Sequence, residues 1–215
     1  HFTILKVMPE NVEKVTRILG SVPTREFYTS IKGIDTGLLL ESLDEPGKLY
    51  SFSIWDSPAS AQATFANPDY AVLIGDLRSL LLAAPAHCGN IQLIGRTFQA
   101  QPPTEKSYIH QTHLTVQPEN VPRLISNLYS EKMLAISQAV PGLLRTDALE
   151  SLDEPGRMIS LSWWESPTAA QKAYQMPEYE DLLSEIGTCF IKKPERFGFR
   201  VLLIVLYGEA SWAQI

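Results

Sequence analysis

Residues 41–48 read Glu-Ser-Leu-Asp-Glu-Pro-Gly-Lys, and residues 150–157 read Glu-Ser-Leu-Asp-Glu-Pro-Gly-Arg. The offset of 109 residues continues on both sides, and it also pairs Trp55-x-Ser-Pro with Trp164-x-Ser-Pro. A period of this length is too long for a solenoid repeat and fits a duplicated domain. The sequence therefore predicts two copies of one module, at residues 1–98 and 108–208, with a polar, proline-rich linker at 99–107 and a tail at 209–215.

Composition is typical of a globular protein. The chain has 215 residues, of which 45% are hydrophobic and 20% charged, and its net charge is −6. This acidic balance argues against a nucleic-acid partner, because binding a phosphate backbone requires a basic surface. Apolar runs such as residues 201–206 have the length of a strand and fall far short of the roughly 18 residues of a membrane span. The start of the sequence reads as a strand and not as a signal peptide, so we expect a cytoplasmic protein without membrane association.

The first half of each copy is predicted to contain a strand, a helix and a hairpin. The strands at 2–8 and 109–117 each end at a proline, which loses no hydrogen bond at the first position of a helix. In the second copy Val121, Leu124, Ile125 and Leu128 have the i, i+3, i+4, i+7 spacing of an amphipathic helix. The repeated Glu-Pro-Gly sequence has the signature of a type II turn, with proline at i+1 and glycine at i+2. It predicts a hairpin between the second and third strands.

The third strand alternates with period two, so its side chains divide between two faces. One face carries serine, serine and tryptophan in both copies: Ser51, Ser53 and Trp55, then Ser160, Ser162 and Trp164. The other face is apolar, with Phe52, Ile54, Leu161 and Trp163. The Ser-Pro pair that follows supplies an N-cap and a first helical residue, which predicts a second helix.

Each copy is expected to end with a helix and a strand. Pro68 and Pro177 should interrupt the second helix, and a fourth strand at about 91–98 and 200–207 should close each copy. Two helices cover only one face of a four-stranded sheet, so the apolar face needs another cover. The predicted fold is therefore α+β: two tandem ferredoxin-like βαββαβ modules that pack sheet to sheet as an intramolecular dimeric α/β barrel, a pseudo-dimer within one chain, with a higher oligomer left open.

These motifs resemble the antibiotic biosynthesis monooxygenase family of the dimeric α/β barrel superfamily. The resemblance rests on the repeated hairpin, on Trp-Asp/Glu-Ser-Pro, and on the Pro-x-Tyr motifs that contain Tyr70 and Tyr179. Members of this family oxidise phenols or hydroquinones with molecular oxygen, because a deprotonated phenol can pass an electron to oxygen. The resemblance implies a cofactor-independent monooxygenase-like enzyme, with no cofactor or metal, whose partners are a small aromatic molecule and O2.

Of the family's site pattern only the tryptophan is present, at Trp55 and Trp164. The family's asparagine falls on Ser51 and Ser160, its tyrosine on Ala61 and Ala170, and its arginine on Gly75 and Ser184. Tyr70 and Tyr179 could occupy space similar to that of the missing tyrosine. In the haem-degrading branch the histidine ligand would fall on Ile74 and Leu183, so haem chemistry is not expected.

The candidate catalytic residues are Trp164, His113, His110 and Trp55. A histidine can act as a base near neutral pH, and His110, which matches His1, projects on the same strand face as Thr112. His113 lies one residue off that face and, as His110-x-x-His113 on a strand, does not form a metal pair. Hydroxyl groups on a covered face need partners and indicate a polar-lined cavity. The candidate substrate-binding residues are therefore Ser160, Ser162, Thr112, Tyr179, Ser51, Ser53, Thr3 and Tyr70.

Two other function classes fit the same pocket. One is a non-catalytic protein that binds a small molecule, and the other is a barrel isomerase or cyclase that acts on a polyketide-like ligand through His110 or His113. The sequence also predicts that the two pockets differ. Ile4, Lys6 and Met8 of the first copy become His113, Thr115 and Gln117 in the second, which places more hydrogen-bonding groups there.

Overall fold

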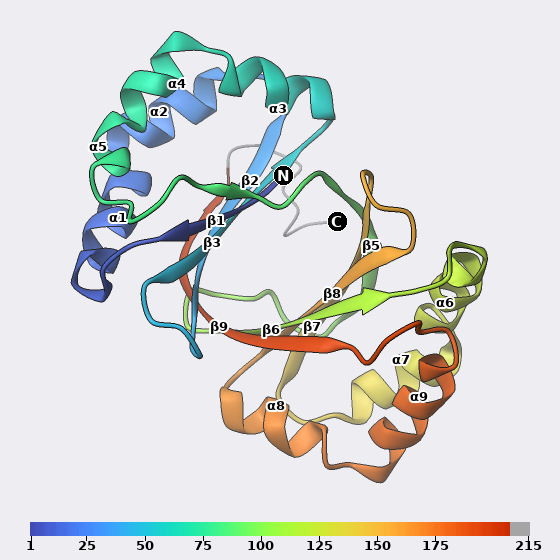
Figure 1. Cartoon of the computed structure of the whole chain (residues 1–215). Coiled ribbons are helices and arrows are strands. Elements are labelled where there is room, and N and C mark those ends of the chain that lie inside the picture. The colour runs from blue at the N-terminus through green and yellow to red at the C-terminus, as the bar shows by residue number, and fades with distance from the viewer. Residues whose placement is uncertain (207–215) are drawn as a thin grey trace. The chain divides into compact units, whose positions relative to one another are not determined.

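The computed structural model describes residues 1–206, apart from the side chains of His87, Leu182, Leu183 and Leu206. The chain forms two compact units (Figure 1). The first comprises residues 1–90 together with the chain from Arg200, and the second comprises residues 91–199. The predicted tail at 209–215 lies outside the described residues.

The first unit contains a sheet with the hydrogen-bonded order β4-β1-β3-β2-β9. Its strands are β1 (Phe2–Lys6), β2 (Ile34–Ser42), β3 (Lys48–Trp55), β4 (Ala86–His87) and the part of β9 (Glu195–Leu206) from Arg200. Its helices are η1 (Pro9–Asn11), α1 (Val12–Leu19), α2 (Val22–Ser30), α3 (Pro58–Phe65), α4 (Pro68–Leu73) and α5 (Gly75–Arg78). Side chains of α1 and α5 pack with β1, β2 and β3 in one core cluster that includes Val15, Leu39, Leu49 and Leu77.

The second unit contains a sheet with the order β9-β6-β8-β7-β5. Its strands are β5 (Ile91–Gln99), β6 (Tyr108–Thr115), β7 (Leu143–Ser151), β8 (Arg157–Trp164) and β9 as far as Phe199. Its helices are η2 (Pro118–Asn120), α6 (Val121–Leu128), α7 (Glu131–Ala139), α8 (Pro167–Ala173) and α9 (Pro177–Gly187). Two core clusters lie under these helices, one around Leu124 and Met158 and one around Trp164 and Phe98.

The predicted order βαββαβ is confirmed in both copies, and the second helical region of each copy is interrupted at a proline. The prolines Pro68 and Pro177 begin α4 and α9, as predicted. The serine before each first-position proline is an N-cap, since Ser57 accepts from Ser60 N at 3.2 Å and Ser166 accepts from Ala169 N at 3.1 Å. The first helical region also breaks in two, into α1 and α2 and into α6 and α7, which the apolar spacing did not indicate.

The prediction that the fourth strand closes its own copy is wrong. β5, from the first copy, pairs antiparallel with β7 of the second copy, from Ile91 opposite Ser151 to Gln99 opposite Arg145. Conversely, β9 of the second copy neighbours β2 in the first unit. The copies at 1–98 and 108–208 are therefore repeats in sequence but not the compact units. Each compact unit takes its last strand from the other copy. A local pattern fixes that a segment is a strand but not which edge it joins.

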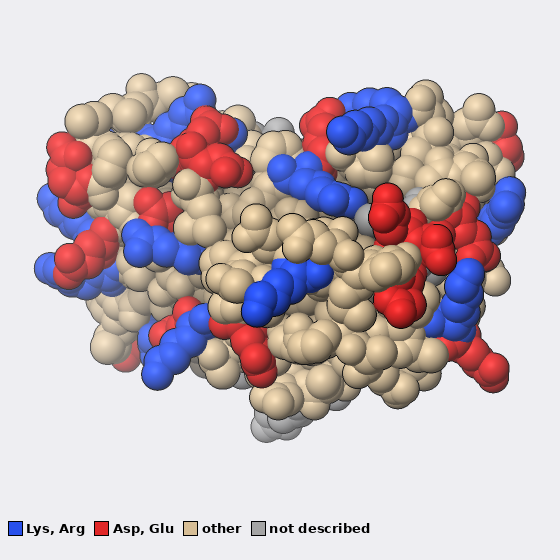
Figure 2. Space-filling model, turned by 90° about the horizontal axis from the view of Figure 1, so that it is seen from below, with Lys and Arg blue, Asp and Glu red and all other residues tan. Residues whose placement is uncertain are grey.

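The packing of the two sheets into an intramolecular barrel stays a prediction. Phe52 is buried in the first unit, and Leu161 and Trp163 are buried in the second, as that packing requires. In the part of the chain that the structure describes, no helix is long and apolar enough to cross a membrane. On the face seen in Figure 2, Lys and Arg side chains are interspersed with Asp and Glu side chains, as is usual for a solvated surface.

The repeated turn depends on glycine. Gly47 and Gly156 both have φ of 81°, and the closing hydrogen bonds run from Lys48 N to Glu45 O at 3.0 Å and from Arg157 N to Glu154 O at 3.1 Å. This geometry is that of the predicted type II turn. A Cβ at position 156 would lie 2.1 Å from Val116 O, a backbone atom.

We predict that Gly156→Ala lowers the free energy of unfolding by about 1–3 kcal/mol, because alanine meets both a positive φ and a backbone clash. Urea unfolding measures the effect. Gly187→Ala is the matched control, since a Cβ at this position at the end of α9 meets nothing within 4 Å and alanine favours the helix. Equal stability of the two variants would contradict the assignment.

Candidate functional site

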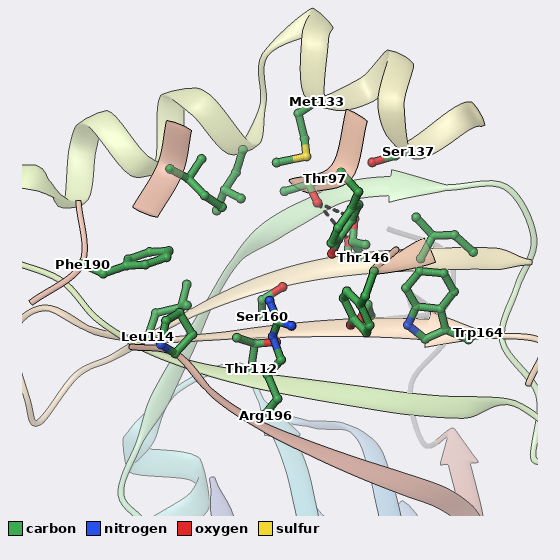
Figure 3. Close-up of a pocket in the computed structure, with 17 residues that line it drawn as sticks. Thr97, Thr112, Leu114, Met133, Ser137, Thr146, Ser160, Trp164, Phe190 and Arg196 are labelled. Carbon is green, nitrogen blue, oxygen red and sulfur yellow. Dashed lines mark hydrogen bonds between the residues drawn. The ribbon is translucent and has the colours of Figure 1, made fainter. Parts of the chain in front are cut away.

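A cavity of about 80 Å³ lies in the second unit, between the helices and the sheet (Figure 3). Strands β5, β6, β7 and β8 form its floor, and α6, α7 and α9 contribute its roof. Its lining is mostly apolar with a few hydroxyl groups, as expected for a small-molecule site. The lining residues are Thr97, Thr112, Leu114, Leu128, Met133, Ser137, Leu143, Thr146, Ser160, Ser162, Trp164, Tyr174, Tyr179, Ile186, Phe190, Pro194 and Arg196.

Five of the predicted site residues meet in this cavity. Thr112 lies opposite Ser160 in the register of β6 and β8, and Ser162 and Trp164 follow Ser160 at intervals of two along β8. Alternate residues of a strand share a face, so these side chains all point toward the helices. Tyr179 of α9 completes the group. The period-two pattern of the third strand therefore located the floor of the pocket.

Trp164 presents a buried hydrogen-bond donor to the pocket. Its side chain is 0% exposed, and its Nε1 has no hydrogen-bond partner among the described residues. Figure 3 shows the indole nitrogen on the edge of the ring that faces the other lining residues. Leaving such a donor unsatisfied costs about 1–3 kcal/mol. Buried polar groups without partners are rare, so this donor requires an explanation.

The equivalent tryptophan of the first copy is satisfied internally. Trp55 Nε1 donates to Ser53 Oγ at 2.8 Å. In the second copy the matching serine is occupied, because Ser162 Oγ donates to His110 O at 3.2 Å and also hydrogen-bonds to Tyr174. The indole of Trp164 is therefore free for a different partner.

Tyr174 is the central residue that the sequence analysis missed. Its hydroxyl hydrogen-bonds to His110 Nδ1 and to Tyr179, and its ring lies 4.9 Å from the His110 ring. Burial raises the pKa of Tyr174, and the neighbouring Tyr179 raises it further. Burial likewise raises the pKa of Tyr179, so both phenols stay protonated at neutral pH. The repeat offset pairs Tyr174 with Phe65, and this gain of a hydroxyl was the available signal.

The first copy builds an aromatic cluster in place of this polar network. His1 packs on Phe65 at 4.6 Å, and Phe65 also contacts Trp55 and Tyr70. Phe65 has no hydroxyl, so the hydrogen bond between Tyr174 and His110 has no counterpart there. Thr3 Oγ1 instead lies 3.4 Å from His1 Nδ1.

A second, smaller cavity lies in the first unit. It measures about 50 Å³ and is lined by Ser51 and Ser53 but not by Trp55, Thr3 or Tyr70. The structure thus separates the predicted residues of the first copy, whereas it gathers those of the second.

His113 does not join the pocket. It lies on the opposite face of β6, where its Nε2 is 2.8 Å from Gln111 Nε2 and its ring packs edge-on against Phe197. Burial, and to a lesser extent the positive charge of Arg157, lowers the pKa of His113 to about 4. A histidine held neutral on the far face does not contact a ligand in this cavity.

Thr97 and Arg196 are among the other lining residues that were not predicted. Thr97 lies in a bulge of β5, since Arg96 pairs with Asp147 and Phe98 pairs with Thr146, and its Oγ1 is 2.5 Å from Thr146 Oγ1. Bulges re-aim side chains and are common beside functional sites. Arg196 lies over the Tyr174 ring, 4.7 Å from its centroid. Both lie on fourth strands, whose placement the sequence did not show.

We predict that His113 makes stability depend on pH. The unfolded histidine titrates near 6.5 and the folded one near 4, so between these values only the unfolded state gains the proton. The free energy of unfolding should therefore fall as pH decreases from about 6.5 to 4, by about 1.4 kcal/mol for each pH unit that separates the two pKa values.

Urea unfolding of wild type and His113→Ile, which copies Ile4 of the first module, tests this. The variant should show a flatter pH dependence over this range, whatever its absolute stability. Other groups that titrate in this range are common to both proteins and cancel in the comparison. Parallel profiles would show that His113 is not protected from protonation.

Comparisons with known proteins bear on the family and the fold. The model of the antibiotic biosynthesis monooxygenase family matches residues 107–183, a range that contains Trp164, Tyr174 and Tyr179. No curated protein has significant sequence similarity to the chain.

Several solved structures share the fold over nearly the whole chain. A candidate monooxygenase from Lactobacillus acidophilus NCFM is 9% identical with a TM-score of 0.66, and the match covers 96% of this chain and 96% of that one. A candidate monooxygenase from Fusobacterium nucleatum subsp. nucleatum ATCC 25586 is 10% identical with a TM-score of 0.67, covering 96% and 93%. An anthrone oxidase-like protein is 15% identical with a TM-score of 0.66, covering 97% and 92%.

Identities this low show a common fold and no more. Because the matches span both copies, the tandem arrangement belongs to that fold. The resemblance inferred from the repeated hairpin and the Trp-x-Ser-Pro motif is confirmed, and the second module is recognised as an antibiotic biosynthesis monooxygenase domain.

Proposed function

We propose that the pocket of the second module binds a phenol or hydroquinone and that the protein oxidises it with O2 without a bound cofactor. The observation that carries the proposal is the buried Trp164 Nε1, which faces the pocket without a partner. A phenolic oxygen is a ligand group that would accept a hydrogen bond from this N–H. The family match and the anthrone oxidase-like neighbour support the same class of reaction.

The lining suits an aromatic ring with an oxygen at one end. Leu114, Leu128, Ile186 and Phe190 offer apolar contacts, and burying a ring against such side chains is favourable. The indole N–H of Trp164 then donates to the substrate oxygen. This hydrogen bond strengthens when the phenol loses its proton, because a charged acceptor binds a donor more tightly than a neutral one.

The pair Tyr174 and His110 provides a route for that proton. The Tyr174 hydroxyl accepts the substrate proton while it passes its own to His110 Nδ1, so the tyrosine never carries a full negative charge. Its raised pKa favours this concerted transfer over formation of a free phenolate. Ser162 donates to the main-chain oxygen of His110 and also hydrogen-bonds to Tyr174, so it ties the tyrosine to the strand that carries the histidine.

The substrate anion is then the reductant. In a hydroquinone, two electrons and two protons pass to O2, which gives the quinone and hydrogen peroxide. In an anthrone-type methylene, one oxygen atom enters the carbon as a carbonyl and the other leaves as water. The residues of the pocket supply orientation, proton transfer and stabilisation of the oxyanion.

Trp164→Phe should lower the rate of oxygen uptake by about 100-fold, as loss of one preorganised oxyanion donor does elsewhere. An oxygen electrode with a panel of hydroquinones and anthrones measures it. Trp55→Phe is the matched change in the first copy and should have a much smaller effect, because Ser53 already holds that indole.

Other outcomes distinguish the alternatives. Equal losses from both changes would indicate two working sites, and a larger loss from Trp55→Phe would contradict the proposal. Ligand-induced thermal stabilisation with no turnover would identify a binding protein. Conversion of the ligand without oxygen uptake would identify an isomerase or cyclase.

Tyr174→Phe recreates the aromatic residue of the first copy and should disconnect the substrate from His110. It removes the proton route and frees Ser162 to accept from the Trp164 indole, as Ser53 does for Trp55. We expect kcat to fall at least about tenfold, as loss of general acid–base catalysis predicts, and the pH profile of kcat to lose the ionisation assigned to His110. Phe65→Tyr is the control. An unchanged rate and pH profile in Tyr174→Phe would exclude the relay.

A further inference from the structure

We propose that Arg196 binds an acidic group of the substrate, so that the pocket selects aromatic acids over neutral aromatics. The inference rests on the pocket of the proposed function and names its substrate class. Arg196 reaches from β9 into the cavity (Figure 3) and supplies its single cationic side chain among the residues that line it.

The alternation of β9 separates Arg196 from its acidic neighbour. Phe197 packs against His113 on the far face of the sheet, and Glu195 also interacts electrostatically with His113. Arg196 points the other way and lies over the Tyr174 ring. Its guanidinium carbon is 4.7 Å from the ring centroid. A guanidinium stacked on an aromatic ring keeps its N–H groups directed outward along its edge, where they can bind a carboxylate with two parallel hydrogen bonds.

No acidic side chain lines this cavity among the described residues. Arg196 also forms no ion pair within the part of the chain that the structure describes, unlike Lys192, which pairs with Glu195 at 2.8 Å. The contrast with Arg145 is informative. That buried arginine contacts Asp147 at 2.8 Å, whereas the side chain of Arg196 is exposed to solvent and lines the cavity, so its charge is available to a ligand.

The positive charge extends outward from the pocket. An open hollow of about 380 Å³ beside it shares Phe190, Pro194 and Arg196 with the cavity and adds Lys192 and Lys193. A ligand whose phenolic oxygen meets Trp164 can therefore place a carboxylate at Arg196, on the side of the pocket where cations gather. An anionic group is attracted there although the chain as a whole carries a charge of −6.

The test compares gentisate, a hydroquinone with a carboxylate, with its neutral methyl ester. Binding of each to the full chain is measured by calorimetry under argon, so that no oxidation occurs. We expect the wild type to bind gentisate at least about tenfold more tightly than the ester, which corresponds to about 1.4 kcal/mol. Raising the ionic strength from about 0.05 to 0.5 M should shrink this preference.

Arg196→Gln should abolish the preference while its affinity for the ester stays within about twofold of wild type, because the amide keeps most of the packing and removes the charge. Arg123→Gln, at an exposed position of α6, is the control and should retain the preference. A purely structural role of Arg196 on Tyr174 would instead weaken acid and ester equally.

The proposal is overturned if ester and acid bind alike, if the preference survives in Arg196→Gln, or if neither compound binds at millimolar concentration. Admitting air then separates the two proposals. Acid-selective binding without oxygen uptake would leave this inference standing and refute the oxidase. Oxygen uptake that is equally fast with the ester would do the reverse.

Discussion

The candidate site depends on how the edge of one sheet is completed. β7 presents a row of backbone donors and acceptors beside the core, and such an edge must be paired. The strand that pairs with it, β5, belongs to the other sequence copy. Its bulge turns Thr97 into the pocket, while Phe98 packs with Trp164 in the core. The second copy therefore contains the chemistry of the site but not the whole of its wall.

Within that frame, one hydroxyl distinguishes the two modules. Where the first copy has Phe65, the serine of the third strand is free to accept the tryptophan N–H. Where the second has Tyr174, the phenol engages the serine and the histidine, and the indole loses its internal acceptor. An indole N–H that is satisfied in one copy is thus unsatisfied in the other, and the proposed function gives it a ligand as its partner. Duplication allows this divergence, because one copy can keep an apolar cluster while the other carries an unsatisfied group at a cost in stability.

Local patterns predicted much of the fold and part of the site. Period-two alternation placed Ser160, Ser162 and Trp164 on one face, and prolines predicted the helix breaks before α4 and α9, because both depend on neighbours in sequence. Strand exchange was missed because the choice of partner edge is a long-range property. Tyr174 was missed because an aromatic at a repeated position reads as core. Arg196 was missed because β9 begins at Glu195, five residues before the expected strand, and its cationic side chain therefore fell in a presumed loop.

The exchanged strands also set the order in which the protein can mature during synthesis. A ribosome releases the first copy long before the second, and an ordinary amino-terminal domain would fold at that point. Here the first unit includes the chain from Arg200, so β2 keeps an unpaired edge until that later segment has been made. The second unit, in contrast, is contiguous from residue 91 to residue 199 and has all its strands before the first unit does. Of the two units, the one whose synthesis begins earlier is thus the one completed later.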